Sequence, residues 1–239
     1  MNILITGGSS GLGKSIVEMA AKENHTVYFT YRNHKENADS ICSQYSNSIS
    51  LNCDFANSKN LKEFLNKIPD FNLDVLVNNA YSGITLGQHF HKTSITEFQE
   101  AFQNNILPLI SITQKCLETF RKKKSGKIIT VLTSALVGTP PMGYSVYAAT
   151  KAYIAQLVKS WSREYIKLGI TSNAVAPDFM ETALTEETND FVKDQIKDGN
   201  PLKNILTTDE VAKVVMNLMD ASPQLNGVII PVNAGINIL

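Results

Sequence analysis

Short apolar segments alternate with amphipathic, helix-like segments along this chain of 239 residues, and this alternation restricts the fold more than any single motif does. The predicted strands are residues 2–6, 26–31, 49–53, 75–78, 127–133, 170–175 and 227–232. The predicted helices are residues 11–23, 35–45, 58–66, 96–121, 147–168 and 208–219. Such regular alternation predicts an α/β fold, a doubly wound parallel sheet of about seven strands with helices on both faces and right-handed crossovers.

The first predicted strand is followed directly by a glycine-rich turn at residues 6–13, and the first helix begins within that turn. Glycine lets a chain turn tightly and approach a ligand without a Cβ in the way. The N–H groups and the dipole at the helix N-terminus favour a bound phosphate. The turn therefore predicts a nucleotide site, in which Gly7, Gly11 and Gly13 would serve a dinucleotide.

A second phosphate-binding pattern overlaps this turn. Residues 8–15 also fit Gly-x-x-x-x-Gly-Lys-Ser, the P-loop of nucleotide hydrolases and kinases, in which Lys14 would bind phosphates and Ser15 would hold Mg²⁺. A P-loop phosphotransferase needs another carboxylate at the end of a second strand, and Asp54 is the one fair candidate. The remainder of the chain favours the dinucleotide.

Tyr147 and Lys151 lie one helical turn apart in a predicted helix, so the phenol and the ammonium share one face. A nearby cation favours the phenolate, and a tyrosine with an ordinary pKa of about 10 would be drawn toward neutrality. Such a group is useful as a general acid or base. By itself the pair is weak support, because the same spacing arises often by chance on exposed helices.

Taken together with other motifs in order along the chain, the pair resembles the pattern of the short-chain dehydrogenase/reductase family. Those motifs are Thr6-Gly7-x-x-x-Gly11-x-Gly13, Asn78-Asn79-Ala80, Asn105, Ser134 and Tyr147-x-x-x-Lys151. The likeness covers essentially the whole chain and is strongest to 3-oxoacyl-[acyl-carrier-protein] reductases. It implies a single Rossmann-type domain over residues 1–239, with a substrate lid near 181–206.

The resemblance also implies a reaction, the NADP-dependent reduction of a ketone to a secondary alcohol by hydride transfer. Tyr147 would act as the general acid, and Lys151 would stabilise the phenolate and hold the nicotinamide ribose. Ser134 would donate a hydrogen bond to the substrate oxygen, where developing charge benefits most from a donor. Asn105 would hold a water that connects Lys151 to solvent. No metal site is expected.

The same resemblance assigns the cofactor contacts, with Asp54 against the adenine and Thr182 against the nicotinamide carboxamide. The full predicted set is Gly7, Ser9, Ser10, Gly11, Leu12, Gly13, Tyr31, Arg32, Asp54, Phe55, Asn79, Ala80, Tyr81, Tyr147, Lys151, Pro177 and Thr182. At the end of the second strand an acidic residue would select NAD and a basic one accommodates the extra phosphate of NADP; here Tyr31 stands about where the acid would be, and Arg32 follows it. Arg32 therefore favours NADP(H), the alternative being a surface residue that starts a loop.

The substrate is less constrained than the cofactor. Tyr81 and Asp178 both stand where relatives usually have glycine, which suits a keto substrate other than a 3-oxoacyl thioester, such as a sugar or a secondary-metabolite intermediate. The basic run at residues 121–124 fits an acidic carrier protein or a CoA phosphate, and it fits a solvated helix end better. A non-catalytic NADP-binding regulator is a further alternative, although such proteins normally lose the tyrosine or the lysine.

Composition bears on partners and location. The chain has 22 basic and 22 acidic residues, which gives no electrostatic reason to expect nucleic acid or an anionic membrane as a partner. Its three cysteines lack paired or metal-type spacing, so we expect a reducing, cytoplasmic location. The family resemblance implies a homodimer or homotetramer that pairs through the helices at 96–121 and 147–168.

Overall fold

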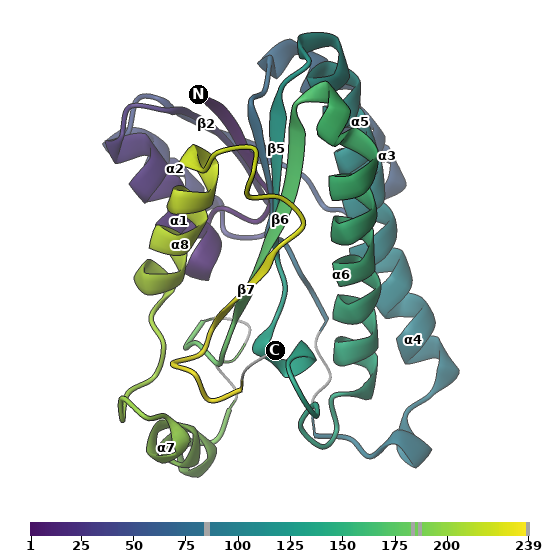
Figure 1. The fold of residues 1–239 in the computed structure, drawn as a ribbon, viewed down its shortest axis with the longest axis vertical. Coiled ribbons are helices and arrows are strands. Elements are labelled where there is room, and N and C mark those ends of the chain that lie inside the picture. Colours follow the sequence, from purple (N-terminus) through teal and green to yellow (C-terminus); the bar gives the residue numbers. More distant parts are fainter. Residues whose placement is uncertain (84–86, 183–184, 186–187, 238–239) are drawn as a thin grey trace.

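A parallel β-sheet of seven strands, in the order β3-β2-β1-β4-β5-β6-β7, forms the centre of the protein (Figure 1). The computed structural model describes residues 1–83, 87–182, 185 and 188–237. The strands are β1 (Asn2–Ile5), β2 (Thr26–Tyr31), β3 (Ser48–Asn52), β4 (Val75–Asn78), β5 (Gly126–Val131), β6 (Ile170–Pro177) and β7 (Ile229–Val232). This order reverses direction between β1 and β4, the switch point at which Rossmann-type sheets bind ligands. The predicted fold class is confirmed.

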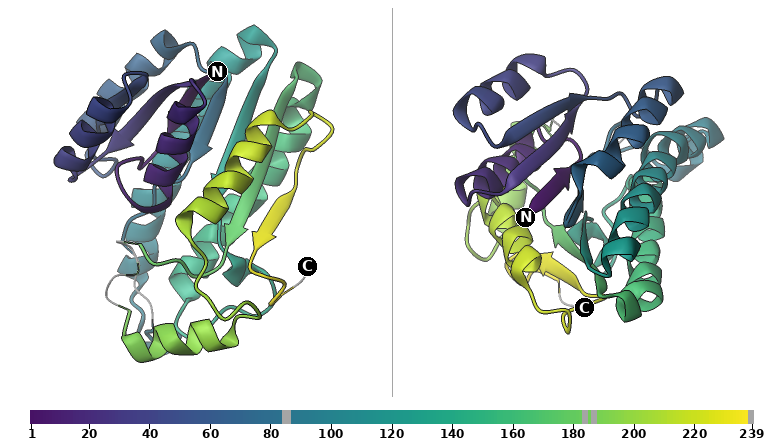
Figure 2. Two further views of the ribbon diagram at one scale, coloured as in Figure 1. Left: turned by 90° about the vertical axis from the view of Figure 1, so that its left-hand side faces the viewer. Right: turned by 90° about the horizontal axis from the view of Figure 1, so that it is seen from above.

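Helices cover both faces of the sheet, as Figures 1 and 2 show. They are α1 (Gly11–Lys22), α2 (Lys35–Gln44), α3 (Ser58–Lys67), α4 (Ile95–Ala101), α5 (Leu107–Lys123), α6 (Ser145–Tyr165), α7 (Asp190–Gly199) and α8 (Thr208–Asp220). Helices α1, α2 and α8 pack on one face, and α3, α5 and α6 pack on the other. Alternation along β1 divides its side chains accordingly, because Ile3 and Ile5 join the first layer while Leu4 joins the second.

The predicted helix over residues 96–121 is interrupted. Helix α4 is followed by the π-helical segment η3 (Phe102–Ile106), and α5 begins only after it. Pro108 lacks an N–H, so the carbonyl four residues earlier loses its α-helical donor. Asn105 Nδ2 also donates to the Ala101 carbonyl oxygen at 3.2 Å, in competition with the backbone. Both effects favour a local change of helical register, and that change carries Asn105 inward.

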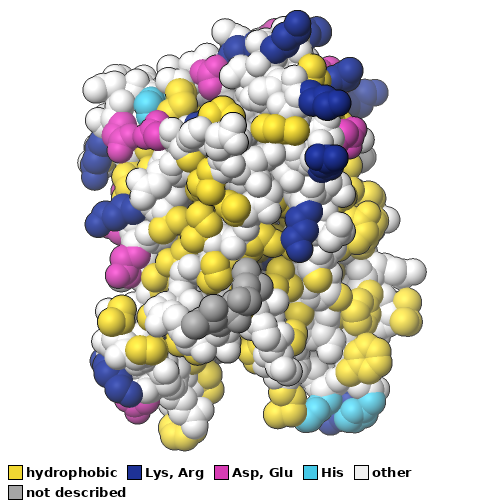
Figure 3. Space-filling view, in the orientation of Figure 1, with side chains coloured by type: hydrophobic (Ala, Val, Ile, Leu, Met, Phe, Trp, Pro, Cys, Tyr) yellow, Lys and Arg dark blue, Asp and Glu magenta, His cyan; other side chains and the backbone are white. Residues whose placement is uncertain are grey.

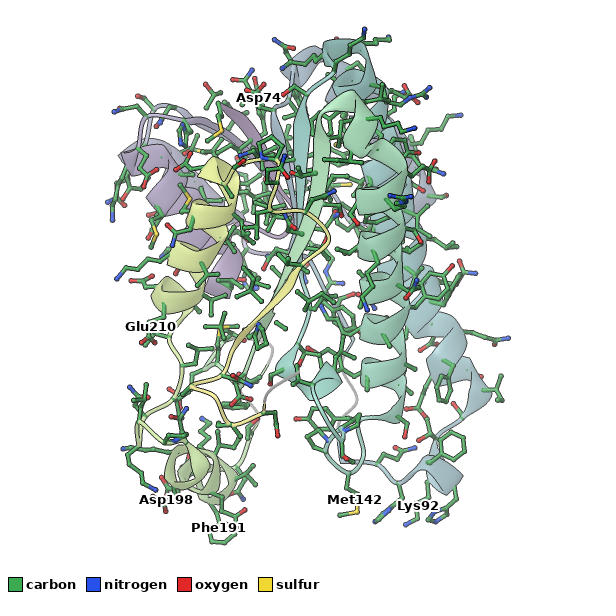
Figure 4. All side chains as sticks on the ribbon, in the orientation of Figure 1. Asp74, Lys92, Met142, Phe191, Asp198 and Glu210 are labelled. Atoms are coloured by element: carbon green, nitrogen blue, oxygen red, sulfur yellow. The ribbon has the colours of Figure 1, made fainter. Side chains whose placement is uncertain are left out.

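Within its described residues, the segment predicted as a lid contains one helix, α7, which lies beyond the carboxyl ends of the strands (Figure 1). Met180 and Leu206 form an isolated parallel bridge that brings the two ends of the segment together. Phe191 of α7 and Met142 lie on opposite sides of the same end of the molecule (Figure 4) and are 68% and 77% exposed. The lid function itself stays a prediction.

Over the residues that the structure describes, no helix has both the length and the apolarity needed to cross a membrane.

Candidate active site

A cleft of about 760 Å³ opens at the carboxyl ends of the central strands, beside the switch point between β1 and β4. In Figure 3 the molecule is notched at this end. Every residue predicted to be catalytic or to bind cofactor lines this one cleft. They are Gly7, Ser9, Ser10, Gly11, Leu12, Gly13, Tyr31, Arg32, Asp54, Phe55, Asn79, Ala80, Tyr81, Asn105, Ser134, Tyr147, Lys151, Pro177 and Thr182. Loops that follow six different strands, β1 to β6, thus meet at one site.

The glycine turn holds the α1 N-terminus against the cleft. Gly7 has a φ of +68°, which glycine adopts without strain, and its N–H donates to Thr30 Oγ1 at 2.9 Å. A Cβ at Gly13 would lie 2.0 Å from the Gly7 carbonyl oxygen, so no side chain fits there. Ser10 is the N-cap residue, yet its side chain makes no capping hydrogen bond. The first N–H groups of α1 are thus available to a phosphate, and the turn fits a dinucleotide.

Asn79, one of the predicted cofactor contacts, also ties the end of β4 to the glycine turn. Its Nδ2 donates to the Thr6 and Gly7 carbonyl oxygens at 2.9 and 3.1 Å. Thr6 Oγ1 in turn accepts from the backbone N–H groups of Asn79 and Ala80. These bonds fix the turn relative to the neighbouring strand.

The competing P-loop interpretation is wrong. Lys14 pairs with Glu18 along the helix at 3.8 Å, and Ser15 Oγ lies 2.8 Å from Thr208 Oγ1 of α8, so both side chains are directed away from the cleft. Neither residue lines the cleft. Asp54 Oδ1 accepts from the Ala56 N–H at 3.0 Å, within its own loop. Within the described ranges, no group of three or more potential metal-binding acids, histidines or cysteines occurs.

Tyr147 and Lys151 project from the first turns of α6 into the cleft. The Lys151 side chain is buried, with 4% of its surface exposed, and Nζ donates to the Val131 carbonyl oxygen at 2.9 Å. Burial lowers the pKa of this ammonium to about 7. Nζ lies 5.9 Å from the centroid of the Tyr147 ring and 4.6 Å from that of the Tyr81 ring.

The pKa of Tyr147 differs from the sequence-based expectation. Burial raises it to about 12, the Thr133 side chain partly offsets that rise, and the Tyr144 phenol adds to it. The expected lowering of this pKa by Lys151 is therefore wrong. The lysine is directed toward the Val131 carbonyl and the Tyr81 ring, so desolvation of the phenolate outweighs its attraction to the ammonium.

Ser134, predicted to donate to the substrate, donates instead to another protein group. Its Oγ is 2.9 Å from Oδ1 of Asp178, the residue that follows β6. A hydroxyl has one proton, so this contact occupies the donor that the substrate oxygen would need.

Asn105 is likewise engaged within the protein. Its Oδ1 accepts from the Ser82 N–H at 2.9 Å, and its Nδ2 donates to the Ser82 carbonyl oxygen at 3.0 Å. The side chain therefore clamps the loop after β4, and both ends of its amide are in use.

Comparison with known proteins agrees with this geometry. A family model described as enoyl-(acyl carrier protein) reductase matches residues 7–237. The 3-oxoacyl-[acyl-carrier-protein] reductase FabG of Staphylococcus epidermidis is 31% identical over 239 residues, covering 97% of each chain. FabG of Staphylococcus aureus (strain Mu50) is 32% identical over 241 residues, covering 97% of this chain and 96% of the relative. The chain belongs to the short-chain dehydrogenase/reductase family. It is therefore an oxidoreductase, as the sequence predicted.

A solved structure extends this likeness within the short-chain dehydrogenase/reductase family. The structure described as ElxO with NADP bound is 28% identical and covers 98% of both chains, with a TM-score of 0.87. The match includes the glycine turn, the sheet and α6, because it spans almost every residue. The fold and the family resemblance are confirmed together.

Among the residues of this short-chain dehydrogenase/reductase that line the cleft without having been predicted, Tyr144 and Thr133 bear directly on Tyr147. Tyr144 lies at the N-cap of α6, its ring 5.9 Å from the Tyr147 ring, and burial followed by the charge of Asp178 raises its pKa. Thr133 precedes Ser134 and caps the short helical turn there through its side chain. Tyr144 stands three residues before Tyr147, and that spacing is the one sequence signal that would have placed it at the site.

Proposed function

We propose that this short-chain dehydrogenase/reductase uses NADPH to reduce a ketone to a secondary alcohol, with Tyr147 as the general acid. One observation carries the proposal: the Tyr147 phenol and the Lys151 ammonium line the same cleft as the uncapped N-terminus of α1. A dinucleotide with its pyrophosphate at α1 would extend along this cleft toward α6. When bound, NADPH supplies the hydride that goes to the carbonyl carbon.

Tyr147 supplies the proton in this scheme. With a pKa of about 12 the phenol is fully protonated near neutral pH, as an acid must be before it donates. Its proton goes to the carbonyl oxygen as that oxygen gains negative charge, and a phenolate is left on Tyr147. Lys151, where protonated, stabilises that phenolate electrostatically. Asn105 acts through the loop after β4, which it holds in place beside the site.

NADP(H) is the cofactor, and Arg32 is the residue that distinguishes it from NAD(H). Arg32 lies at the rim of the cleft beyond β2, and its carbonyl oxygen accepts from Asn52 Nδ2 at 3.0 Å. No carboxylate forms an ion pair with Arg32 in the described part of the chain. Its planar guanidinium suits a phosphate, and the similar ElxO structure is described as binding NADP.

Two measurements test the proposal. NADPH should bind with a change in nicotinamide fluorescence, and a panel of ketones should then cause the NADPH absorbance to fall. Binding without oxidation by any ketone would leave a non-catalytic NADP-binding protein, the alternative left open by the sequence. Absence of NADPH binding would remove the reductase assignment altogether.

A 3-oxoacyl thioester is the second candidate substrate. It is favoured by the FabG relatives, which are named as 3-oxoacyl-[acyl-carrier-protein] reductases and match 97% of this chain. The basic run at residues 121–124 gives no support, because it ends α5 at the far edge of the sheet from the cleft. There Lys123 bonds Asp74 at 2.6 Å, and Figure 4 shows Asp74 opposite Met142 and Phe191. Acetoacetyl thioesters in the ketone panel address this candidate.

A homo-oligomer is proposed as well. Phe102 and Leu107 are each 38% exposed and Tyr153 is 46% exposed, on the outer surface of η3, α5 and α6. The Phe102 and Tyr153 rings are in contact, with centroids 5.5 Å apart. Exposed aromatic and aliphatic side chains on adjacent helices are typical of an interface. Light scattering should give the mass of a dimer or tetramer, and a monomer would contradict this.

A further inference from the structure

Asp178 is the one carboxylate that lines the Tyr147 end of the cleft, as far as the described residues show. The other acid in the lining, Asp54, follows β3 at the opposite end. The backbone of Asp178 is fixed, because its N–H donates to the Val232 carbonyl oxygen at 3.0 Å. Its half-buried side chain therefore has a defined position beside Ser134. The family pattern has glycine at this position, so the carboxylate is a feature of this chain.

The Asp178 carboxylate is only partly satisfied by the protein. Oδ1 accepts from Ser134 Oγ at 2.9 Å, and no donor among the described residues reaches Oδ2. No ion pair involves Asp178 in the described ranges. Its charge nevertheless affects the site, since it contributes to raising the pKa of Tyr144. A half-buried carboxylate of this kind favours a ligand that brings a hydrogen-bond donor or a positive charge.

Ser134 links this carboxylate to the reacting centre. The hydroxyl has a single proton, and a charged acceptor holds it more strongly than a neutral carbonyl oxygen does. While Asp178 keeps that proton, Ser134 has none for a substrate. A substrate donor bound at the open Oδ2 would draw negative charge away from Oδ1, weaken the bond from Ser134 and so free the hydroxyl to turn toward the carbonyl oxygen.

We infer that Asp178 selects keto substrates that carry a hydrogen-bond donor, either a hydroxyl or an ammonium group, on the carbon next to the carbonyl. The inference rests on the proposed reductase function. Such a substrate satisfies Asp178 and completes the donor set around its own carbonyl oxygen through Ser134. A substrate with a methylene or an ether at that carbon leaves Ser134 bonded to Asp178, and a substrate with a carboxylate there is repelled.

Four aryl ketones of similar size form the probe: α-hydroxyacetophenone, α-aminoacetophenone, α-methoxyacetophenone and benzoylformate. Their affinities for the protein–NADP⁺ complex are measured by calorimetry, which needs no turnover. The hydroxy and amino ketones should bind about 10- to 100-fold more tightly than the methoxy ketone, the range of one charge-assisted hydrogen bond. Benzoylformate should bind most weakly. Equal affinities, or no binding of the donor-bearing ketones, overturn the inference.

Variants assign the preference to Asp178. Asp178→Gly should reduce the ratio between hydroxy and methoxy ketone to about one. Asp178→Asn keeps the shape and an acceptor but removes the charge, so the amino ketone should lose more affinity than the hydroxy ketone. Asp70→Asn, an exposed carboxyl at the opposite edge of the sheet, is the matched control and should keep the wild-type ratios. A wild-type ratio in Asp178→Gly contradicts the inference, and Asp178→Asn provides the same test should the glycine variant fail to fold.

Turnover separates this inference from the proposed function. Selective binding without oxidation of NADPH would contradict the reductase proposal and leave the recognition role of Asp178 standing. Oxidation of NADPH by all four ketones at similar kcat/KM would support the reductase proposal and contradict substrate selection by Asp178. Ser134→Ala adds a check on the coupling: it should lower kcat for the hydroxy ketone by a larger factor than kcat for the methoxy ketone. Equal losses for both ketones would show that Asp178 does not control the Ser134 proton.

Discussion

The Lys151 ammonium lies 4.6 Å from the centroid of the Tyr81 ring, closer than the 5.9 Å that separates it from the Tyr147 ring. The Tyr81 and Tyr147 rings also meet edge to face, with centroids 5.3 Å apart. An ammonium over an aromatic face gains about 0.5–2 kcal/mol. The family pattern has glycine at position 81. The Tyr81 ring therefore shields Lys151 from water and contacts it in a way that a glycine could not.

Tyr81→Gly should move the pH dependence of catalysis. Opening one side of Lys151 to water relieves the desolvation that lowers its pKa to about 7, and this gain outweighs the lost attraction between the ammonium and the ring, so the pKa should rise toward its ordinary value of 10.5. If protonated Lys151 supports the reaction, kcat/KM falls as pH rises through this pKa, and the fall should occur at higher pH in the variant. Tyr81→Phe keeps the ring and should keep the wild-type profile. Superimposable profiles for wild type and Tyr81→Gly would contradict the shielding role.

Tyr147→Phe should lower kcat by about 100- to 10,000-fold, the usual contribution of a positioned general acid. The ring and its contacts with Tyr81 and Tyr144 remain, so NADPH affinity should stay nearly constant. Rapid-mixing kinetics and fluorescence titration measure the two quantities separately. Tyr153→Phe, on the exposed surface of the same helix, is the control. Full turnover by Tyr147→Phe would remove the phenol from the mechanism.

Lys151→Met should stabilise the protein near neutral pH. The pKa of Lys151 falls from 10.5 to about 7 on folding, so between these pH values the unfolded chain binds more protons than the native protein. Stability therefore rises with pH across that window, and the penalty is greatest below about pH 7. Removing the amine should add on the order of 4 kcal/mol to the free energy of unfolding near pH 6, and less near pH 10.

Urea unfolding at several pH values measures this effect. Lys159→Met is the matched control, because Lys159 is exposed on the same helix and its replacement should leave the pH dependence unchanged. A gain that is the same at every pH would show that added apolar contact, rather than the buried charge, is responsible.

Gly13→Ala should disrupt the cofactor turn. The added Cβ would lie 2.0 Å from the Gly7 carbonyl oxygen and 2.6 Å from Asn79 Nδ2, so the backbone must shift. We expect a loss of about 1–3 kcal/mol or more in the free energy of unfolding, together with weaker NADPH binding. Gly199→Ala, where a Cβ would meet nothing within 4 Å, should unfold like the wild type. Thermal unfolding and NADPH titration of both variants measure these two effects, and a Gly13→Ala protein that matches Gly199→Ala in both would contradict the prediction.

Sequence patterns were sufficient to place residues but not to describe their interactions. Spacing alone put Tyr147 and Lys151 on one helix face, because helical periodicity is a local property. The pKa of Tyr147 depends on how deeply the ring is buried, and the Lys151 contact with Val131 joins two elements distant in sequence. Neither follows from local spacing.

Dependence on contacts between distant elements also explains why the hydrogen bond from Ser134 to Asp178 was not predicted. Its partner Asp178 follows a different strand, and the two meet only because β5 and β6 are neighbours in the sheet. The π-helical turn at Asn105 likewise depends on Pro108 and on contacts with the loop after β4. The seven strands, in contrast, were predicted because apolar runs and helical periodicity are repeated so regularly.

Arg32→Ala should weaken the binding of NADPH about 10- to 100-fold and leave NADH binding nearly unchanged, because the two cofactors differ by one phosphate. The neighbouring Lys35 is less able to compensate, since its ammonium is bonded to Asp39 at 2.5 Å. Raising the salt concentration should weaken NADPH binding to the wild type more than to the variant, because the guanidinium at the exposed rim is accessible to ions. Arg163→Ala on the exposed face of α6 controls for a general change in charge. Equal losses for NADPH and NADH in Arg32→Ala would mean that Arg32 supports the loop after β2 rather than the phosphate.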